Sequence, residues 1–452
     1  MGHNDGRIGT LVHAADLHIG APLKGVANRF PEDEQHLANY FRQEVSEAFD
    51  NLINITIEEN ADILVLAGDI YDGIEQEFSA QNKFSKGLSK LVGAGVRVFI
   101  VHGNHDPLIS ELRKDVELPP EVIVFDNKSK ADLHTVELRS GVEIQVAGMS
   151  FKKKEESRNL VQEFFNNEKL KPKNPGTTIG VLHTNVGSAG GHGNYAPCSV
   201  QDLHDSPIGY WALGHIHKRR IERLEEGNNR RWWAYSGNLQ GASPKPSECE
   251  PKGCLVVNIF ADGFGEPVFR PCDTVRFGLL QVDLSELREE EEINSRIEGK
   301  ISDEIESFQR DNANEKPTIM SIELNGATKA WGSIPRTETE LIDWVRGIIG
   351  GNSKDCAIIK AKNQVSPAAD LEQLQNREDL QGNLFRAVDE LRIEDLISQI
   401  RDEGLDNPAQ RKTLDSLLET DSIFAFQQIH DQVRNLLLRE WENQQNAQAG
   451  HG

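Results

Sequence analysis

The sequence predicts an α/β protein in which two packed sheets are flanked by helices and followed by a small α+β unit and a helical C-terminal region. Short apolar runs alternate with helical patterns from Arg7 to about Arg270. The pattern then changes to a small mixture of strands and helices, and no convincing strand occurs from about Asp370 to Gln444. Strands that alternate with helices indicate parallel pairing in a sheet whose faces are covered.

The chain is long enough for several domains. Its 452 residues exceed the roughly 100 to 200 residues of a typical domain. Pro367 and the small residues beside it mark a boundary. We therefore expect domains at residues 1–272, 273–366 and 367–452, the last ending in a disordered polar tail, ENQQNAQAGHG.

The N-terminal part opens with a βαβαβ pattern. The stretches IGTLVHAADLH, ADILVLAGDIYDG and VRVFIVHGNHDP each predict a buried strand, and apolar residues at helical spacing predict helices over about 32–59 and 78–92. Further strands are expected at VIVFDN, GVEIQVAGMSF, TTIGVLHTN, GYWALGHIHK, RWWAYSGNLQG and GCLVVNIF, with helices near 157–170 and 199–204. This number of strands favours two packed sheets with helices outside.

The second half contains fewer strands. After PCDTVRFGLLQVDLSEL we expect a helix over about 286–308, a strand TIMSIEL, a helix TETELIDWVRGII and a strand CAIIKAK. Apolar helical faces near 384–400 and 424–438 then lie in a strongly charged background. Either these faces dock a partner or they pack within their own domain.

Composition restricts the class of protein. No apolar stretch approaches the ~20 residues that span a bilayer, and the N-terminus MGHNDGRIGT lacks the features of a signal peptide. We therefore expect a cytoplasmic protein that does not associate with membranes. The five cysteines are scattered without a CxxC pair and are expected to be reduced.

The charge of the chain limits how it can bind nucleic acid. The formal net charge is −23, of which −8 falls up to Arg270 and −15 beyond it. A protein that coats nucleic acid by bulk electrostatics presents a basic face instead. Any contact with nucleic acid must then be local.

Five short polar motifs each follow a predicted strand. They contain Asp16 and His18 (ADLH), Asp69 (AGDIYD), Asn104 and His105 (GNHD), His183 (VLHTN), and His215 and His217 (GHIH). Loops at the carboxyl ends of strands gather along one edge of an α/β sheet, so these side chains can converge on one crevice. Residues at i and i+2 on extended backbone face the same side, so the DxH and HxH pairs each offer two neighbouring ligands.

The residue types in these motifs predict a metal centre. Aspartate, histidine and asparagine suit a divalent cation such as manganese, zinc or iron, and the lack of cysteine disfavours a structural zinc site. Seven or so ligands are too many for one ion. Two ions roughly 3.5 to 4 Å apart, bridged by a carboxylate, would use them all and serve phosphoester hydrolysis.

Taken singly, the motifs differ in specificity. A DxH pair is usually an ordinary loop feature, and GxHxH alone is as often something else as a metal site. GNHD is more specific, and the order of all five motifs carries the prediction. His13 and His102 lie inside apolar strands and fit core histidines better, and Asp72 fits a turn residue.

With these residues in place, the segment from about Arg7 to Val257 resembles the calcineurin-like metallophosphoesterases. The blocks of that family run DxH, GD, GNHD or GNHE, a lone histidine and GHxH. Within it, HAADLHIGAPLKG, YWALGHIHKR and SGNLQG most resemble the DNA-repair exonucleases of the SbcD and YhaO type.

The resemblance implies a role for each polar residue. The implied ligand sets are Asp16, His18 and His217 for a first ion and Asn104, His183 and His215 for a second, with Asp69 bridging the two. His105 would contact the scissile phosphate and protonate or stabilise the leaving oxygen, which suits a side chain with a pKa near the operating pH. Asp106 either orients His105 or is an ordinary surface residue.

The resemblance also suggests roles for the remaining segments. Residues 277–365 have the position and size of a cap that limits which DNA reaches the metals; the alternative is a dimerisation or stabilising module, so a homodimer stays open. The helices after the cap would dock an ABC-type coiled-coil ATPase of the SbcC or YhaN kind. Arg219 and Arg220 either contact DNA phosphates or form a solvated surface.

Three functions compete at this stage. The leading one is a manganese-dependent DNA phosphodiesterase, an exonuclease with or without endonuclease activity, which works with an ATPase in double-strand-break repair. The second keeps the chemistry but acts on a cyclic nucleotide, a nucleotide or a phospholipid head group. The third is a metal-binding scaffold with little catalytic power, against which the complete ligand set and His105 argue.

Overall fold

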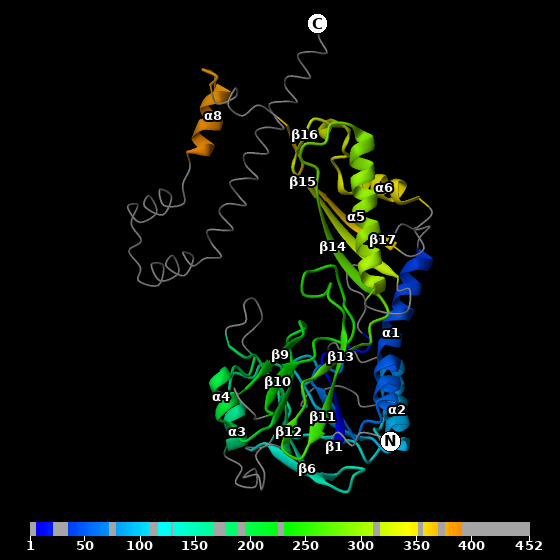
Figure 1. Cartoon of the computed structure of the whole chain (residues 1–452), viewed down its shortest axis with the longest axis vertical. Coiled ribbons are helices and arrows are strands. Elements are labelled where there is room, and N and C mark those ends of the chain that lie inside the picture. The colour runs from blue at the N-terminus through cyan, green and yellow to red at the C-terminus, as the bar shows by residue number, and fades with distance from the viewer. Residues whose placement is uncertain are drawn as a thin grey trace. The chain divides into compact units, whose positions relative to one another are not determined.

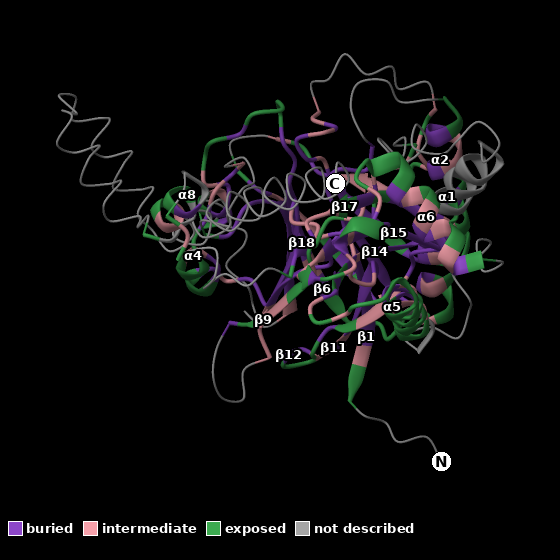
Figure 2. Ribbon diagram, turned by 90° about the horizontal axis from the view of Figure 1, so that it is seen from above, coloured by how far each residue is buried: buried purple, intermediate pink, exposed green. Residues whose placement is uncertain are grey.

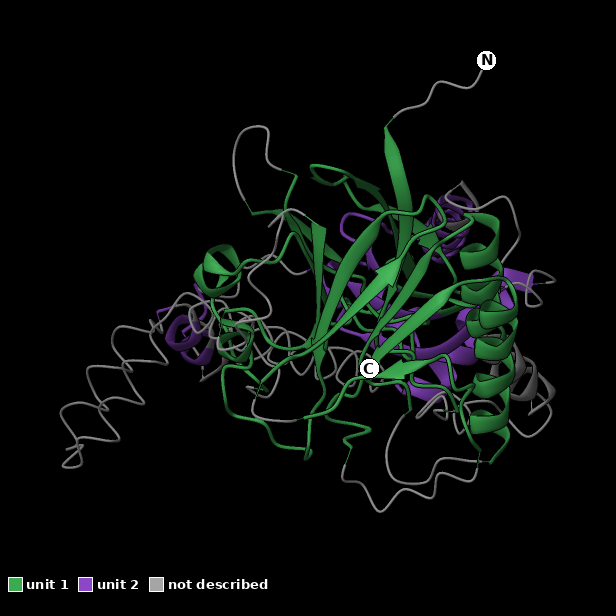
Figure 3. Ribbon diagram, turned by 90° about the horizontal axis from the view of Figure 1, so that it is seen from below, with its two compact units in different colours: residues 1–278, 308–319 green, residues 279–307, 320–452 purple. Residues whose placement is uncertain are grey.

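The computed structural model describes most of the chain. The described residues are 6–20, 35–71, 78–108, 116–127, 130–165, 177–187, 195–224, 230–310, 317–350, 356–368, 376–378 and 380–390. They form two compact units, one of residues 1–278 and 308–319 and one of residues 279–307 and 320–452 (Figure 3). The domain boundaries expected after residues 272 and 366 stay predictions.

The first unit contains two sheets (Figure 1). The first sheet has the order β12-β11-β1-β2-β3-β4, with β13 paired to β11. Its strands are β1 (Arg7–Ala14), β2 (Ile63–Ala67), β3 (Arg97–Val101), β4 (Ile123–Val124), β11 (Gly253–Phe260), β12 (Gly263–Phe264) and β13 (Val268–Pro271). The second sheet has the order β5-β6-β7-β8-β10-β9. Its strands are β5 (Asp132–Glu137), β6 (Glu143–Met149), β7 (Thr178–His183), β8 (Tyr210–Gly214), β9 (Arg220–Arg223) and β10 (Trp232–Tyr235).

The centre of each sheet is parallel. Strands β1, β2, β3 and β4 pair in parallel, as do β6, β7, β8 and β10. Antiparallel strands flank these parallel sets, namely β11 beside β1, β5 beside β6 and β9 beside β10. Strand β2 is buried along its whole length, because both faces of its sheet are covered, and this explains its uninterrupted apolar sequence ILVLA.

Three apolar layers hold the first unit together. Helices α1 (Gln35–Glu58) and α2 (Phe78–Gly93) cover the first sheet through residues such as Phe49 and Phe84. Helices α3 (Val161–Phe165) and α4 (Val200–Asp205) cover the second sheet, where Phe164 packs edge-to-face on Trp211. The layer between the sheets joins side chains of both, so the predicted two-sheet sandwich flanked by helices is confirmed (Figure 1).

Burial follows this layering. The middle of the sheets is buried, whereas the start of β1 at Arg7 is exposed (Figure 2).

Helix α4 begins with a reciprocal cap. The Ser199 side chain accepts a hydrogen bond from the Asp202 backbone N–H, and the Asp202 carboxylate accepts one from the Ser199 backbone N–H.

Some elements differ from the sequence expectations. Strands β5 and β9 were not expected, because both are partly exposed edge strands with a weak apolar pattern. Of the helix expected over 157–170, the structure describes only Val161–Phe165, and residues 166–170 lie outside the described part.

The second unit is a small α+β assembly. Its main sheet has the order β14-β15-β17, with β14 (Arg276–Asp283), β15 (Thr318–Asn325) and β17 (Cys356–Asn363). Its other elements are α5 (Glu290–Arg310), α6 (Glu338–Ile349), α8 (Leu380–Asp389) and the pair β16 (Ala327–Thr328) and β18 (Ser366–Pro367). Most of the helical faces expected near 384–400 and 424–438, and the tail, lie outside the described residues.

No helix in the described part of the chain has the length and apolarity needed to cross a membrane.

Candidate metal centre

The predicted ligands lie at or just beyond the carboxyl ends of strands from both sheets. In the first sheet Ala67, which ends β2, pairs with Val101, which ends β3, so both strands stop at the same level. In the second sheet His183 at the end of β7 pairs with Gly214 at the end of β8. Because neighbouring parallel strands end together, motifs far apart in the sequence reach one place.

Two groups of ligand atoms form at this place. Asp16, His18 and His217 make the first group and Asp16, Asp69 and His183 the second, with the ligand atoms of each group within 4.8 Å of one another. Asp16 is thus common to both groups. The bridging role expected for Asp69 stays a prediction.

The remaining predicted residues join the same region. Asn104 Oδ1 lies 3.0 Å from His183 Nε2. The His215 ring centroid is 5.2 Å from that of His183, and its backbone N–H donates to the Asp16 carboxylate over 3.1 Å. The His105 backbone N–H donates to Asp69 Oδ1 over 2.9 Å, and its ring centroid is 5.1 Å from that of His18. The structure therefore brings all seven predicted ligands and His105 together.

The backbone is strained at four of these residues. Asp16, His18, Asp69 and His215 have φ values of 50°, 46°, 51° and 99°. They are four of the seven non-glycine residues with positive φ in the described part of the chain. Such conformations persist only where the surroundings determine them, and they gather at functional sites.

Hydrogen bonds hold these left-handed turns in place. The Asp16 N–H donates to the Gly68 carbonyl over 3.0 Å and the His18 N–H to the Asp69 carbonyl over 3.1 Å. The loop after β1 is therefore fastened to the loop after β2, and both present their carboxylates to the centre.

The His183 side chain is oriented by a backbone carbonyl. Its Nδ1 lies 3.0 Å from the Ala67 carbonyl oxygen, which can only accept, so Nδ1 carries the hydrogen. In the neutral ring the Nε2 lone pair then faces Asn104 Oδ1 and, at 3.3 Å, Asp69 Oδ2.

The charges of Asp69 and His183 are strongly coupled. Burial alone would lower the pKa of His183, but the Asp69 carboxylate outweighs it and raises the pKa of His183 to about 9. Burial likewise opposes ionisation of Asp69, yet His183 lowers the pKa of that carboxyl far below its usual range. Without metal, a proton on His183 thus balances the carboxylate, and a cation would replace that proton.

The two histidines of the first group respond in opposite directions to their surroundings. His18 Nε2 and His217 Nε2 lie 3.3 Å apart. Burial lowers the pKa of His18, whereas for His217 a bond to Glu248 and the charge of Asp16 outweigh burial and raise the pKa. Carboxylates and imidazoles in two groups that share Asp16, with the Asn104 amide oxygen beside the second group, are a donor set that fits two divalent cations.

Asp106 connects two loops of the centre. Its carboxylate accepts from the backbone N–H groups of Ile70 and Gly103, each over 2.9 Å, and contacts His102 Nδ1 at 3.1 Å. It is 1% exposed, which rules out the ordinary surface residue considered above. These bonds shape the loop that carries His105, and the orienting role of Asp106 toward the His105 ring stays a prediction.

The two arginines after the GHIH motif make contacts within the chain. The Arg219 guanidinium lies 3.8 Å from the centroid of the Phe269 ring. Arg220 lies 4.8 Å from the centroid of a ring of Trp233, and its Nε is 3.1 Å from Glu222. Their proposed contact with DNA phosphate stays a prediction.

Sequence reasoning missed a group of buried residues behind His217. The Glu248 carboxylate lies 2.8 Å from His217 Nδ1, and Lys252 Nζ lies 2.7 Å from the His217 carbonyl oxygen. Both come from the segment between β10 and β11, which carries no recognisable motif. No signal in the sequence alone connects them to GHIH.

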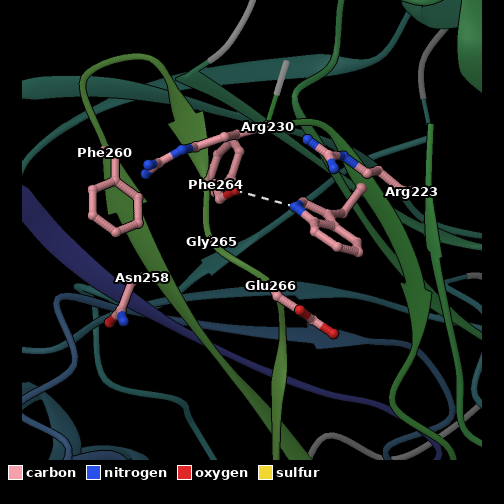
Figure 4. A pocket seen from close by; sticks show the side chains of 8 residues that line it. Arg223, Arg230, Asn258, Phe260, Phe264, Gly265 and Glu266 are labelled. Carbon is pink, nitrogen blue, oxygen red and sulfur yellow. Dashed lines mark hydrogen bonds between the residues drawn. The ribbon is translucent and has the colours of Figure 1, made fainter. Parts of the chain in front are cut away.

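A separate pocket lies away from the centre (Figure 4). Trp232 lines it and donates from Nε1 to the Phe264 carbonyl over 3.1 Å, with Arg223 and Arg230 nearby. Trp232 pairs with Tyr210, the first residue of β8, whereas the metal centre lies beyond its last residue, Gly214. The pocket therefore lies at the amino ends of β8 and β10, whereas the metal centre lies at the carboxyl end of β8.

A two-sheet α/β sandwich that carries a carboxylate and histidine centre at its strand ends defines a metal-dependent phosphoester hydrolase. Residues 9–219 match the family model of the calcineurin-like phosphoesterases. The chain contains a calcineurin-like metallophosphoesterase domain, and it is a hydrolase of that class.

Several relatives of known name share this domain. The chain is 23% identical over 433 residues to the uncharacterized metallophosphoesterase YhaO of Bacillus subtilis, covering 95% of this chain and 97% of YhaO. It is 27% identical over 232 residues to the DNA double-strand break repair protein Mre11 of Methanocaldococcus jannaschii, covering 51% of this chain and 56% of Mre11. It is 34% identical over 99 residues to SbcD, a component of the nuclease SbcCD of Rhodobacter capsulatus, covering 22% of this chain and 21% of SbcD.

The extent of these matches differs. The similarity to YhaO extends over nearly the whole of both chains, whereas the match spans little more than half the length of the archaeal Mre11. The relatives named as repair proteins and nucleases support the DNA-repair branch of the family.

Proposed function

We propose that the chain is a two-metal DNA phosphodiesterase, an exonuclease that uses manganese and acts in DNA repair with an ABC-type coiled-coil ATPase. The observation that carries the proposal is the convergence of seven ligand residues with His105 at the carboxyl ends of strands from both sheets. The similarity to Mre11 and to SbcD of the nuclease SbcCD supports DNA as the substrate.

The ligand residues divide between two ions. Asp16, His18 and His217 would hold one ion, Asn104, His183 and His215 the other, and Asp69 would contact both. When bound, two divalent ions stabilise negative charge on the phosphoryl oxygens and lower the pKa of a water molecule, so that it becomes nucleophilic at neutral pH. The imidazoles also suit zinc and iron, whereas the carboxylates and the amide oxygen suit manganese, the proposed ion.

His105 is the proposed proton donor. It is partly exposed, and its backbone N–H is fastened to the Asp69 carboxylate over 2.9 Å, which holds it beside the ligands. Its ring is therefore near enough to the centre to reach a bound phosphate from the solvent side. From there it would protonate or stabilise the leaving oxygen when the phosphodiester bond breaks.

The remaining parts of the chain would select the substrate. The net charge of −23 requires that contacts with DNA be local, and Arg219 and Arg220 directly follow the GHIH ligands. The small α+β segment over 277–365 would act as a cap, and the helical region after it would bind the ATPase.

The test is digestion of end-labelled linear double-stranded DNA by the purified full chain in manganese. Asp69→Asn removes a ligand charge without changing the shape of the side chain, and Asp132→Asn, on β5, makes the same change away from the centre. We expect the wild type and Asp132→Asn to shorten the DNA and Asp69→Asn not to. If the wild type and Asp132→Asn cleave a small chromogenic phosphodiester but leave DNA intact, DNA as the substrate of the isolated chain is rejected.

A further inference from the structure

We propose that Glu248 is a positioning residue of the metal centre, whose carboxylate holds the His217 ring with Nε2 directed at Asp16 and His18. The inference rests on one part of the proposed function, the binding of divalent ions at this centre. Glu248 lies 31 residues after His217 and belongs to none of the five motifs.

The contacts of the carboxylate define the state of the ring. Glu248 is 7% exposed, and its Oε1 lies 2.8 Å from His217 Nδ1. A carboxylate can only accept, so Nδ1 carries the hydrogen and the Nε2 lone pair of the neutral ring points away from Glu248. On that side His18 Nε2 lies at 3.3 Å, within the group that also contains Asp16.

The other oxygen of the carboxylate is held as well. Its Oε2 accepts from Asn238 Nδ2 over 2.7 Å. The Glu248 side chain is therefore fixed at both oxygens, and it cannot rotate away from His217 without leaving a buried amide donor unsatisfied.

The backbone of His217 is held from the same segment. Lys252, which is 3% exposed, donates from Nζ to the His217 carbonyl over 2.7 Å and to the Ser247 carbonyl over 2.5 Å. A Cβ on Gly237, whose φ is +78°, would lie 2.7 Å from the His217 carbonyl oxygen, so only glycine allows this close approach. Residues 236–252 thus hold both the ring and the backbone of one ligand.

His183 and His217 differ in the group that accepts the hydrogen bond from Nδ1. His183 donates to a neutral carbonyl, that of Ala67, whereas His217 donates to a carboxylate. A carboxylate partner raises the basicity of a histidine ligand, and removal of such a partner typically weakens metal binding by about 10- to 100-fold. We therefore expect the ion bound by Asp16, His18 and His217 to depend on Glu248 more than the other ion does.

The experiment compares Glu248→Gln and Glu248→Ala with the wild type as full chains. Glu156→Gln is the matched control, because Glu156 is a buried carboxylate of the same unit whose side chain bonds to Arg158. Chelator-treated protein is titrated with manganese, and the free ion is followed by electron paramagnetic resonance. The midpoint of thermal unfolding is measured for each protein in EDTA and in saturating manganese.

A positioning role predicts a selective effect on one ion. In Glu248→Ala one of two manganese sites weakens about 10- to 100-fold. Glu248→Gln, whose amide oxygen still accepts the bond without the charge, loses less. Both variants gain less thermal stability from manganese than the wild type, while Glu156→Gln changes the midpoint in EDTA and keeps the wild-type affinities.

Two results would overturn the inference. One is that both manganese affinities of Glu248→Gln and Glu248→Ala stay within about twofold of the wild type. The other is that Glu248→Gln weakens both sites equally and lowers the midpoint in EDTA as much as in manganese, which is the behaviour of a purely structural residue. DNA digestion is assayed in parallel, so a wild type that binds two ions without cutting DNA rejects the proposed function alone.

Discussion

Replacement of Gly103 by alanine should disable the metal centre while the chain still folds. A Cβ on Gly103 would lie 2.2 Å from Asp69 Oδ1 and 2.8 Å from His183 Nε2. Non-bonded heavy atoms are normally about 3.5 Å apart, so the two side chains would have to move by about 1 Å. Gly103 does not have a positive φ, so the effect of the substitution is steric.

The size of the effect follows from the surroundings of Asp69. Its Oδ1 accepts from the His105 N–H over 2.9 Å and its Oδ2 lies 3.3 Å from His183, so it cannot turn aside without breaking these contacts. Overpacking of this kind usually destabilises by about 1–3 kcal/mol, which lowers the melting temperature by roughly 2–12 °C in a domain of this size. A displacement of about 1 Å at catalytic groups lowers the rate about 100-fold.

The assay combines DNA digestion in manganese with thermal unfolding. Gly93→Ala is the matched control, because a Cβ on this last residue of α2 meets nothing within 4 Å. We expect Gly93→Ala to match the wild type and Gly103→Ala to lose at least about 100-fold in rate. If Gly103→Ala cleaves DNA within about threefold of the wild-type rate, Asp69 and His183 do not have to hold these positions and the steric reasoning is refuted.

Three further predictions concern catalysis, metal and pH. His105→Ala should abolish hydrolysis while two manganese ions still bind, and full activity in this variant would reject the role of His105 as the proton donor. EDTA should stop hydrolysis, and manganese at 100 times its Kd should add about 2.7 kcal/mol of stability; a melting temperature that manganese does not change would argue against the centre. Burial alone would raise the pKa of Glu156, but hydrogen bonds from Arg158 outweigh it and lower that pKa. The ionised Glu156 therefore stabilises the fold above its unfolded pKa of about 4.3, and this stabilisation is lost as the pH falls through the lower folded pKa. Denaturant unfolding in EDTA should therefore show Glu156→Gln about 1 kcal/mol less stable than the wild type at pH 7, with a difference that shrinks in acid; a pH-independent difference would contradict this.

The α/β sandwich and the members of the centre could be predicted from the sequence, because the signals for both are local. An uninterrupted apolar run such as ILVLA identifies a strand covered on both faces, and the polar residues directly after such runs lie at the carboxyl edge of the sheet. The spacing of Asp16 and His18, and of His215 and His217, predicts neighbouring ligands on the basis of extended backbone. The left-handed conformations of Asp16, His18 and His215 nevertheless show that the real turns are tighter than simple extended chain.

The contacts that orient the ligands are decided only in the tertiary structure. Glu248 reaches His217 across 31 residues, and Asp106 joins the loops after β2 and β3, through bonds that no periodic pattern encodes. The edge strands β5 and β9 were not predicted either, because their partial exposure removes the apolar alternation that marks a strand. The sequence by itself thus determined which residues reach the sheet edge, since local spacing and strand ends suffice for that. Only the folded chain decided which nitrogen of His183 and of His217 faces the centre, since that depends on partners brought together from distant segments.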